Sequence, residues 1–181
     1  MKKIAVKIKL ADRGRATLPL KESGKRLGDE FKEFDRIFLP MGYTQAYGGA
    51  DKAPKLIIRT ISRDGKDTHQ LIFKRFVTDH VVLYYQTQIF DYAQLAHIVT
   101  HIGYEFYGQV NKVRAQVLAG DTLFSLDTID NYESYYLKIE KTVADDVPVE
   151  VNELENILKS LGLSEAERLD EEYIEIERKG K

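Results

Sequence analysis

Charged and hydroxyl side chains recur at alternate positions in the stretch 112–140, KVRAQVLAGDTLFSLDTIDNYESYYLKIE. Residues two apart on a β-strand point to the same face of a sheet. Two alternating runs around a turn-rich centre can therefore build one polar surface from Lys112, Arg114, Ser125, Asp127, Lys138 and Glu140. Arginine and lysine bind phosphate oxygens and carboxylates bind divalent cations, so this surface suits the chemistry of a phosphorylated anion.

Strands elsewhere in the chain also place cations at alternate positions. The residues that we expect to share a polar interior and to bind phosphate are Lys7, Lys9, Arg59, Arg63, Lys74, Lys112, Arg114 and Lys138. Gln86 and Gln88 are expected to face the same way. Like charges enclosed together repel one another, so these eight cations predict a compact polyanion, such as a triphosphate chain, as the ligand that neutralises them.

Alternating hydrophobicity predicts eight strands, most of them joined by hairpins, at 2–10, 31–39, 55–63, 68–77, 80–90, 104–118, 122–130 and 134–143. Helical spacing predicts a helix that Asp91 caps and Gly103 ends, another after Asn152 that Gly162 ends, and a short one within 12–28. We expect a long loop at 41–54, and a short strand or frayed helix in the ending EEYIEIER.

These elements predict an α+β fold, an eight-stranded antiparallel β-barrel or tunnel with a polar lumen, flanked by two to three helices. One domain would span 1–181, with a C-terminal helix and acidic tail at 149–181. The alternative is a sheet with one solvated face.

Composition narrows the classes of function. The 181 residues include no cysteine, which excludes disulfides, thiolate zinc sites and cysteine catalysis. The sequence has no apolar run long enough for a membrane span and no signal peptide, so we expect a cytoplasmic protein. Residues 1–144 hold 22 lysines and arginines against 17 acids, whereas residues 145–181 hold 5 against 12. The acidic tail is interpreted as a solvated helix surface.

The order of these segments resembles the CYTH superfamily, the triphosphate tunnel enzymes that include class IV adenylate cyclases and thiamine triphosphatases. The similar segments are the first strand with its Lys9, EFDRIFLP, KLIIRT, QLIFK, HIGYEF followed by VNKVRAQV, FSLDTIDNYESYYLKIE and ELENILKSLGL. The resemblance implies an eight-stranded tunnel in which Arg59, Lys74, Lys112 and Arg114 bind phosphate. It implies that Asp127 and Glu140 are the catalytic and metal-binding carboxylates, with Mg²⁺ or Mn²⁺ as the cofactor.

The chain departs from the family's pattern in its acids. Ala5 and Lys7 stand where the family's ExExK motif has glutamates, and Lys138 stands where its last motif has an acid. The fifth strand has Gln86 and Gln88 where the family offers acids. The family's carboxylates hold the divalent ions that bind the triphosphate.

Three functions are consistent with the sequence. The one we favour is binding of a phosphorylated small molecule (a nucleoside triphosphate, inorganic triphosphate or polyphosphate) with weak or lost metal-dependent catalysis and no cofactor. The second is an active Mg²⁺- or Mn²⁺-dependent triphosphatase or adenylate cyclase that uses Asp127, Glu140 and Glu133. The third is a tunnel fold reused for a protein or RNA partner, with nucleic acid the less favoured ligand.

Overall fold

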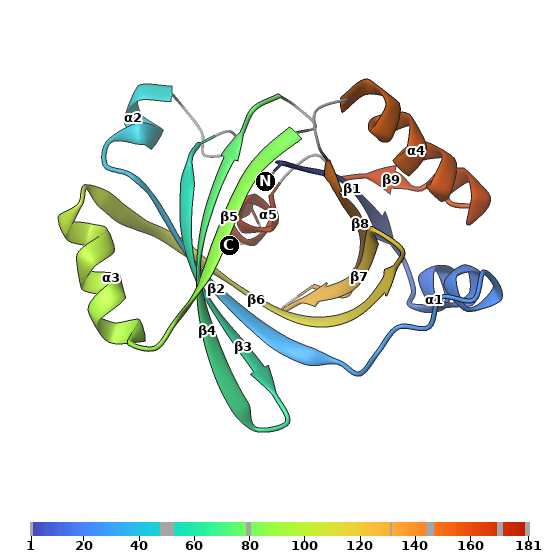
Figure 1. Cartoon of the computed structure of the whole chain (residues 1–181), viewed down its shortest axis with the longest axis horizontal. Coiled ribbons are helices and arrows are strands. Elements are labelled where there is room, and N and C mark those ends of the chain that lie inside the picture. Colours follow the sequence, from blue (N-terminus) through green and yellow to red (C-terminus); the bar gives the residue numbers. More distant parts are fainter. Residues whose placement is uncertain are drawn as a thin grey trace. The chain divides into compact units, whose positions relative to one another are not determined.

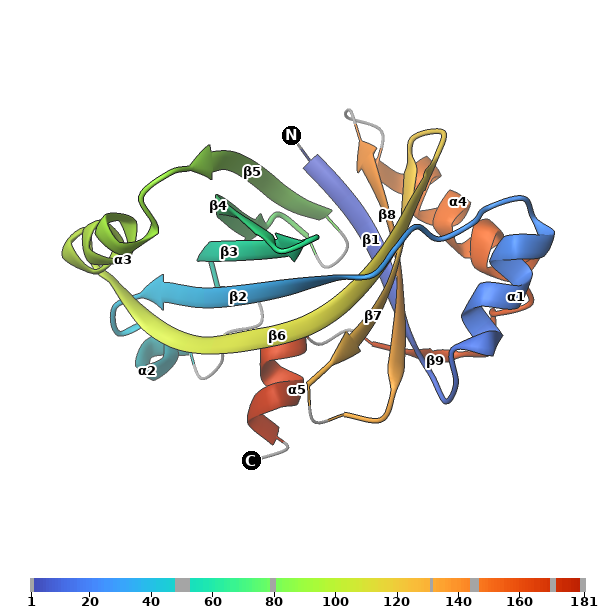
Figure 2. The ribbon, with the colours of Figure 1, turned by 90° about the horizontal axis from the view of Figure 1, so that it is seen from below.

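The computed structural model describes residues 2–47, 53–78, 81–130, 132–143, 147–169 and 172–179. The chain divides into two compact units, unit 1 (Met1–Phe31 and Lys112–Asp170) and unit 2 (Lys32–Asn111 and Glu171–Lys181). Strand β6 (Tyr104–Ala119) is the longest in the part of the chain described, and it continues without a break from unit 2 into unit 1 (Figures 1 and 2).

Unit 1 is an antiparallel sheet with two helices. The second half of β6 begins the strand order β6-β7-β8-β1-β9. The other elements are β1 (Lys2–Leu10), α1 (Gly14–Glu22), β7 (Thr122–Ile129), β8 (Tyr135–Val143), α4 (Val147–Ser160) and β9 (Glu167–Arg168). Figure 1 shows α1 and α4 on the same side of β1 and β8.

Alternation along β1 and β8 separates an apolar face from a polar one. Ile4 and Ile8 of β1, and Leu137 of β8, are completely buried on the apolar face. Helix α4 contacts both strands and buries Leu158 completely. Burial of each such side chain contributes roughly 1.5–3 kcal/mol, so the apolar face fixes the direction of the opposite, polar face.

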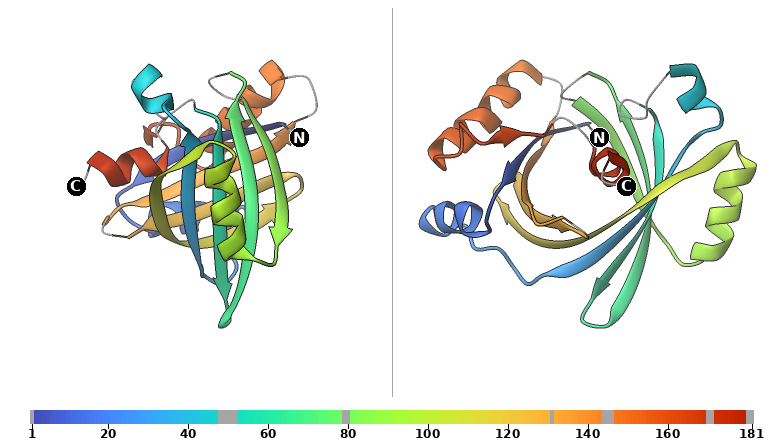
Figure 3. Two further views of the ribbon diagram at one scale, coloured as in Figure 1. Left: turned by 90° about the vertical axis from the view of Figure 1, so that its left-hand side faces the viewer. Right: turned by 180° about the vertical axis from the view of Figure 1, so that it is seen from behind.

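Unit 2 is a second antiparallel arrangement, in the strand order β5-β4-β3-β2-β6. Its elements, besides the first half of β6, are β2 (Phe31–Pro40), α2 (Tyr43–Tyr47), β3 (Lys55–Arg63), β4 (Lys66–Phe76), β5 (Val81–Ile89), α3 (Tyr92–His101) and α5 (Tyr173–Lys179). Figure 3 shows α3 against the strands of this unit.

Helix α3 covers the apolar face of unit 2. Phe38, Leu56 and Ile58 form a buried cluster with Val99 of the helix. The helix begins as expected, because the Asp91 side chain accepts a hydrogen bond from the backbone of Gln94 at 2.9 Å. It ends at Gly103, whose φ of 92° few other residues adopt.

The predicted α+β fold, with eight antiparallel strands and flanking helices, is confirmed, while the prediction of a single domain stays a prediction. Three details differ. The stretch expected to be a loop at 41–54 contains α2, and residues 48–52 lie outside the described part. Helix α4 begins at Val147, before the predicted start, and the two-residue strand β9 was not expected.

The ending EEYIEIER forms α5, the helical one of the two predicted alternatives. None of the helices in the described residues is long and apolar enough to cross a membrane.

Candidate functional site

The polar side chains of unit 1 share one face, which we call polar face 1. Strand register sets Arg114 opposite Asp127, Ser125 opposite Lys138, and Lys138 opposite Lys7. Directly opposed residues of an antiparallel pair point to the same side. Ser125 lies on polar face 1, as expected. The charged members of this face are Lys3, Lys7, Lys9, Lys112, Arg114, Asp127, Lys138 and Glu140. The six residues that the sequence grouped within 112–140 therefore do lie on one face.

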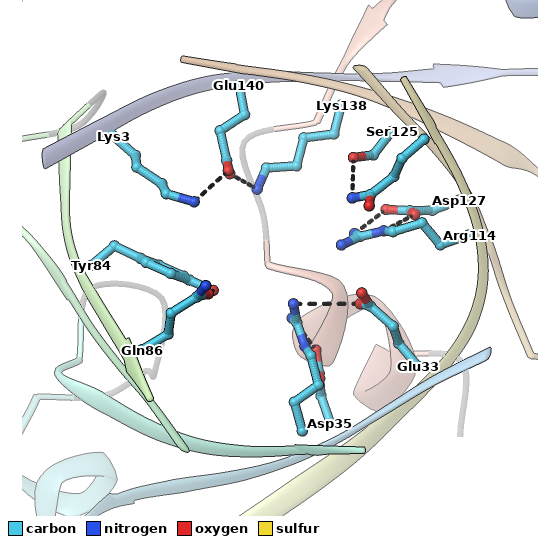
Figure 4. A network of polar contacts seen from close by, with 12 residues as sticks. Lys3, Glu33, Asp35, Tyr84, Gln86, Arg114, Ser125, Asp127, Lys138 and Glu140 are labelled. Carbon is cyan, nitrogen blue, oxygen red and sulfur yellow. Dashed lines mark hydrogen bonds and ion pairs between the residues drawn. The ribbon is translucent and has the colours of Figure 1, made fainter. Parts of the chain in front are cut away.

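A buried pair joins β6 to β7. The Arg114 guanidinium donates from Nε to Asp127 Oδ1 at 2.5 Å and from Nη2 to Oδ2 at 2.7 Å. Arg114 is 6% exposed and Asp127 is completely buried. Two parallel charge-assisted hydrogen bonds fix the guanidinium plane. Figure 4 shows this pair.

Glu140 lies between two ammonium groups. Its Oε1 accepts from Lys3 Nζ at 2.8 Å, and its Oε2 accepts from Lys138 Nζ (Figure 4). Burial favours the neutral acid, but the nearby charges of Lys138 and Lys3 outweigh it and hold the pKa of Glu140 well below its usual range. Glu140 is therefore an anion that already neutralises cations on polar face 1.

The polar side chains of unit 2 share polar face 2. Register sets Asp35 opposite Arg59, Arg59 opposite Gln70, and Gln70 opposite Gln88. The polar and charged members of polar face 2 are Glu33, Asp35, Lys55, Arg59, Arg63, Lys66, Thr68, Gln70, Lys74, Tyr84, Gln86 and Gln88. Gln86 and Gln88 thus face the same way as the cations of this unit, as expected, although both side chains are exposed.

Arg59 of β3 contacts two carboxylates of the neighbouring strand β2. Its Nε and Nη2 donate to the two oxygens of Asp35 at 2.6 and 2.8 Å. Its Nη1 lies 3.5 Å from Glu33 Oε2. Both acids are buried, so they need the guanidinium to compensate for lost hydration.

Lys74 pairs with the C-terminal segment. Its ammonium contacts the carboxylate of Glu172, the residue before α5. Directly opposite Lys74 lies Lys55, whose side chain is buried. Arg63 is exposed near the tip of the β3–β4 hairpin.

The interpretation that an outside anion must neutralise the eight cations is wrong for several of them. Carboxylates of the chain contact Arg59, Lys74, Arg114 and Lys138. Four contributors were missed: Glu33, Asp35, Lys3 and Glu172. Alternation in FKEFDRIFL could have found the first two, because Glu33 and Asp35 lie two apart on a strand. Alternation in KKIAVKIKL could have found Lys3, two residues before Ala5.

The acidic tail is also not a solvated surface throughout. Glu153 of α4 accepts from Lys141 Nζ at 2.6 Å, and Glu175 of α5 accepts from the Tyr107 hydroxyl at 2.8 Å. The hydrogen bonds that the Lys141 ammonium donates to Glu153 and Asp121 raise the pKa of Lys141. The tail therefore supplies carboxylates to both units.

The carboxylates assigned to Mg²⁺ or Mn²⁺ do not fit that role. Asp127 is held by a guanidinium and Glu140 by two ammonium groups. A divalent ion would have to displace these cations and tolerate the positive charge of Lys7, which lies opposite Lys138. Across the described ranges, no three metal-binding side chains of the His, Cys, Asp and Glu types come together.

Comparison with solved structures finds matches over nearly the whole chain. PH1819 from Pyrococcus horikoshii has a TM-score of 0.79 at 17% identity, with 99% of each chain covered. A candidate adenylate cyclase from Vibrio parahaemolyticus has a TM-score of 0.75 at 18% identity, with 97% of each chain covered. HpAC1 from Hippeastrum, a candidate adenylyl cyclase with a dominant triphosphatase activity, has a TM-score of 0.62 at 18% identity over 100% of this chain and 97% of its own.

The chain shares their fold. The fold that the resemblance implied is thus the fold found in proteins named as an adenylate cyclase and as a triphosphatase. No protein-family model and no curated protein matches the sequence. The named site residues stay predictions of function, although their placement on two polar faces is now established.

Proposed function

We propose that polar face 1 binds a phosphorylated polyanion, of which a triphosphate chain is the simplest example. The observation that carries the proposal is the charge of the face. Among its described residues, six cations face two carboxylates of the sheet, with the exposed Glu167 of β9 as a third. Lys7 and Lys138 lie directly opposite each other, so Glu140, which contacts Lys138, has several positive charges close to it on this face.

The side chains of this face suit phosphate in two ways. The guanidinium of Arg114 is held in one plane by Asp127, so little freedom is lost when its remaining donors meet an oxygen. Lys7, Lys9 and Lys138 are flexible point charges that adapt to successive phosphates. The names of the Vibrio protein and of HpAC1 support a nucleotide or an inorganic triphosphate as the anion.

Metal-dependent cleavage by this chain is weak or lost. Glu140 and Asp127 are the acids that such cleavage would require, and both are held by cations of the same face. An ammonium group neutralises phosphate, but it does not activate a bound water as a metal ion does. We therefore propose that the protein binds a phosphorylated anion without cleaving it, and that it does so in the cytoplasm without a membrane partner.

Calorimetry tests the binding. Inorganic triphosphate and ATP are titrated into the protein with and without Mg²⁺, at low and at high salt. We expect binding without Mg²⁺, and a loss of about tenfold in affinity for Lys7→Ala, because one close charge is removed. Lys21→Ala, which removes an exposed lysine of α1, is the matched control and should change little. A folded protein that releases or takes up no heat with either anion would rule the function out.

Active triphosphatase or adenylate cyclase chemistry is the second candidate, favoured by the names of two neighbours. Release of phosphate or pyrophosphate from ATP and triphosphate, with Mg²⁺ or Mn²⁺, distinguishes the two candidates. We expect no turnover above the level of Glu140→Ala. Turnover that Glu140→Ala abolishes and Lys21→Ala preserves would establish the enzyme instead.

A further inference from the structure

The C-terminal helix α5 is attached to the strands of unit 2 by acids. The carboxylate of Glu172 contacts the Lys74 ammonium, and Glu175 Oε1 accepts from the Tyr107 hydroxyl at 2.8 Å. Figures 1 and 3 show α5 beside the strands of unit 2. An acid of the chain thus contacts one of the cations that the sequence assigns to phosphate.

Two lysines lie close together where Glu172 contacts the sheet. Lys55 and Lys74 are directly opposed on β3 and β4, and Lys55 is only 1% exposed. The two ammonium groups lie 5.6 and 5.0 Å from the centroid of the Phe76 ring, whose face attracts cations. Two opposed lysines repel each other, and one nearby negative charge relieves that repulsion. Glu172, whose carboxylate contacts Lys74, is a negative charge of this kind.

Helix α5 depends on its contacts. It has seven residues, too few for a helix that is stable by itself in water. Ile174 is 3% exposed and packs at Gly108, where an added Cβ would lie 2.6 Å from Ile174 Cδ1. An ion pair, a hydrogen bond and a close apolar contact are among the interactions that hold the helix in place, and a ligand that competes for the ion pair weakens its attachment.

We propose that Glu172 is an intramolecular competitor for a phosphate group at the site of Lys55, Lys74 and Phe76. A phosphate bound to Lys74 repels the carboxylate of Glu172, so anion binding at this site and docking of α5 exclude each other. The proposal rests on the proposed function, that the protein binds phosphorylated anions. It adds a second contact point for them on unit 2 and a segment that regulates access to it.

Substitution of Glu172 tests the competition. Glu172→Gln keeps the size of the side chain and removes its charge. We expect it to bind inorganic triphosphate about tenfold more tightly than the wild type in calorimetry, because the competent state no longer has to displace a carboxylate. Glu165→Gln, which neutralises an exposed acid of the same tail, should stay within twofold. Tyr107→Phe loosens α5 without altering charge and should tighten binding two- to threefold.

Hydrogen exchange of residues 173–179 supplies a readout that does not depend on affinity. Triphosphate should accelerate exchange of these amides in the wild type, and Glu172→Gln should accelerate it without ligand. Equal affinity of wild type and Glu172→Gln, with unchanged exchange, would overturn this inference and leave the proposed function standing. Absence of triphosphate binding in all of the folded variants would remove the proposed function and this inference with it.

Discussion

Units 1 and 2 are each built around one arginine–aspartate pair on a polar sheet face, yet they balance charge differently. Arg114–Asp127 and Arg59–Asp35 are both bidentate, between neighbouring strands. On polar face 2, away from the exposed hairpin tip, three cations (Lys55, Arg59 and Lys74) are matched in number by three carboxylates (Glu33, Asp35 and Glu172), which contact Arg59 and Lys74. Polar face 1 carries about twice as many cations as carboxylates among its described residues.

The difference in charge balance predicts different sources of stability for the two faces. A face whose acids come from its own strands and from the tail is stabilised without a ligand. A face with an excess of cations gains more from an anion that binds only the folded state. We therefore expect substitutions of acids on the two faces to differ in stability and in their response to triphosphate.

The largest effect is expected at the most deeply buried pair. Asp127→Asn leaves the Arg114 guanidinium buried without its carboxylate, and should lower the free energy of unfolding by about 3–5 kcal/mol. Urea denaturation measures this. Glu30→Gln, which breaks the exposed Arg13–Glu30 pair, is the control and should cost less than about 1 kcal/mol. A loss below that value for Asp127→Asn would mean that Arg114 finds another partner.

The corresponding change on polar face 2 should cost less. Asp35→Asn removes two hydrogen bonds from Arg59, but Glu33 stays 3.5 Å away from the guanidinium as a second anion. We expect a loss of about 2 kcal/mol in the same denaturation series. Triphosphate should restore more stability to Asp127→Asn than to Asp35→Asn, because polar face 1 has the larger excess of cations. Equal restoration would contradict the contrast between the two faces.

Acid should weaken polar face 1 through Glu140. The pKa of Glu140 is lower in the folded state than its ordinary value of 4.5, so the unfolded chain takes up the proton first as pH falls. The contribution of Glu140 is therefore complete above about pH 5 and is lost as pH falls toward the folded pKa. Its size is on the order of 2 kcal/mol, the scale for a carboxylate paired with cations.

Denaturation of wild type and Glu140→Gln between pH 3 and 7 measures that contribution. The two curves should converge at low pH, since the protonated acid resembles the amide. Parallel curves over this range would show that Glu140 contributes no more when it is charged than when it is neutral.

Most of the two polar faces could be predicted because strand alternation is a local property. Lys7, Arg59, Lys112 and Lys138 lie on the faces that their own strands indicate. The same rule indicates that Glu33 and Asp35 share one face of β2. Local pattern thus gives the direction of a side chain reliably where an apolar face is buried opposite.

Contacts between distant segments could not be predicted in this way. Glu140 meets Lys3 across 137 residues because the first and last long strands pair, and Lys74 meets Glu172 across 98 residues. In EEYIEIER, Ile174 and Ile176 alternate as in a strand, whereas the segment becomes helical where Ile174 packs at Gly108. A seven-residue segment takes its structure from such packing more than from its own sequence.

The smallest effect is expected at the edge of polar face 1, where β9 meets β1. Lys9 Nζ lies 3.6 Å from Glu167 Oε2, and both side chains are well exposed, at 40% and 64%. Water screens a pair of this kind, so Glu167→Gln should change the free energy of unfolding by less than about 0.5 kcal/mol. The same change removes an acid from the proposed binding face and should tighten triphosphate binding by about twofold at low salt and not at high salt. Denaturation and calorimetry on one preparation measure both effects. A loss of stability above about 1 kcal/mol would show that pairing of β9 with β1 requires this ion pair. The stability of polar face 1 would then come from its edge as well as from the buried pair of Arg114 and Asp127.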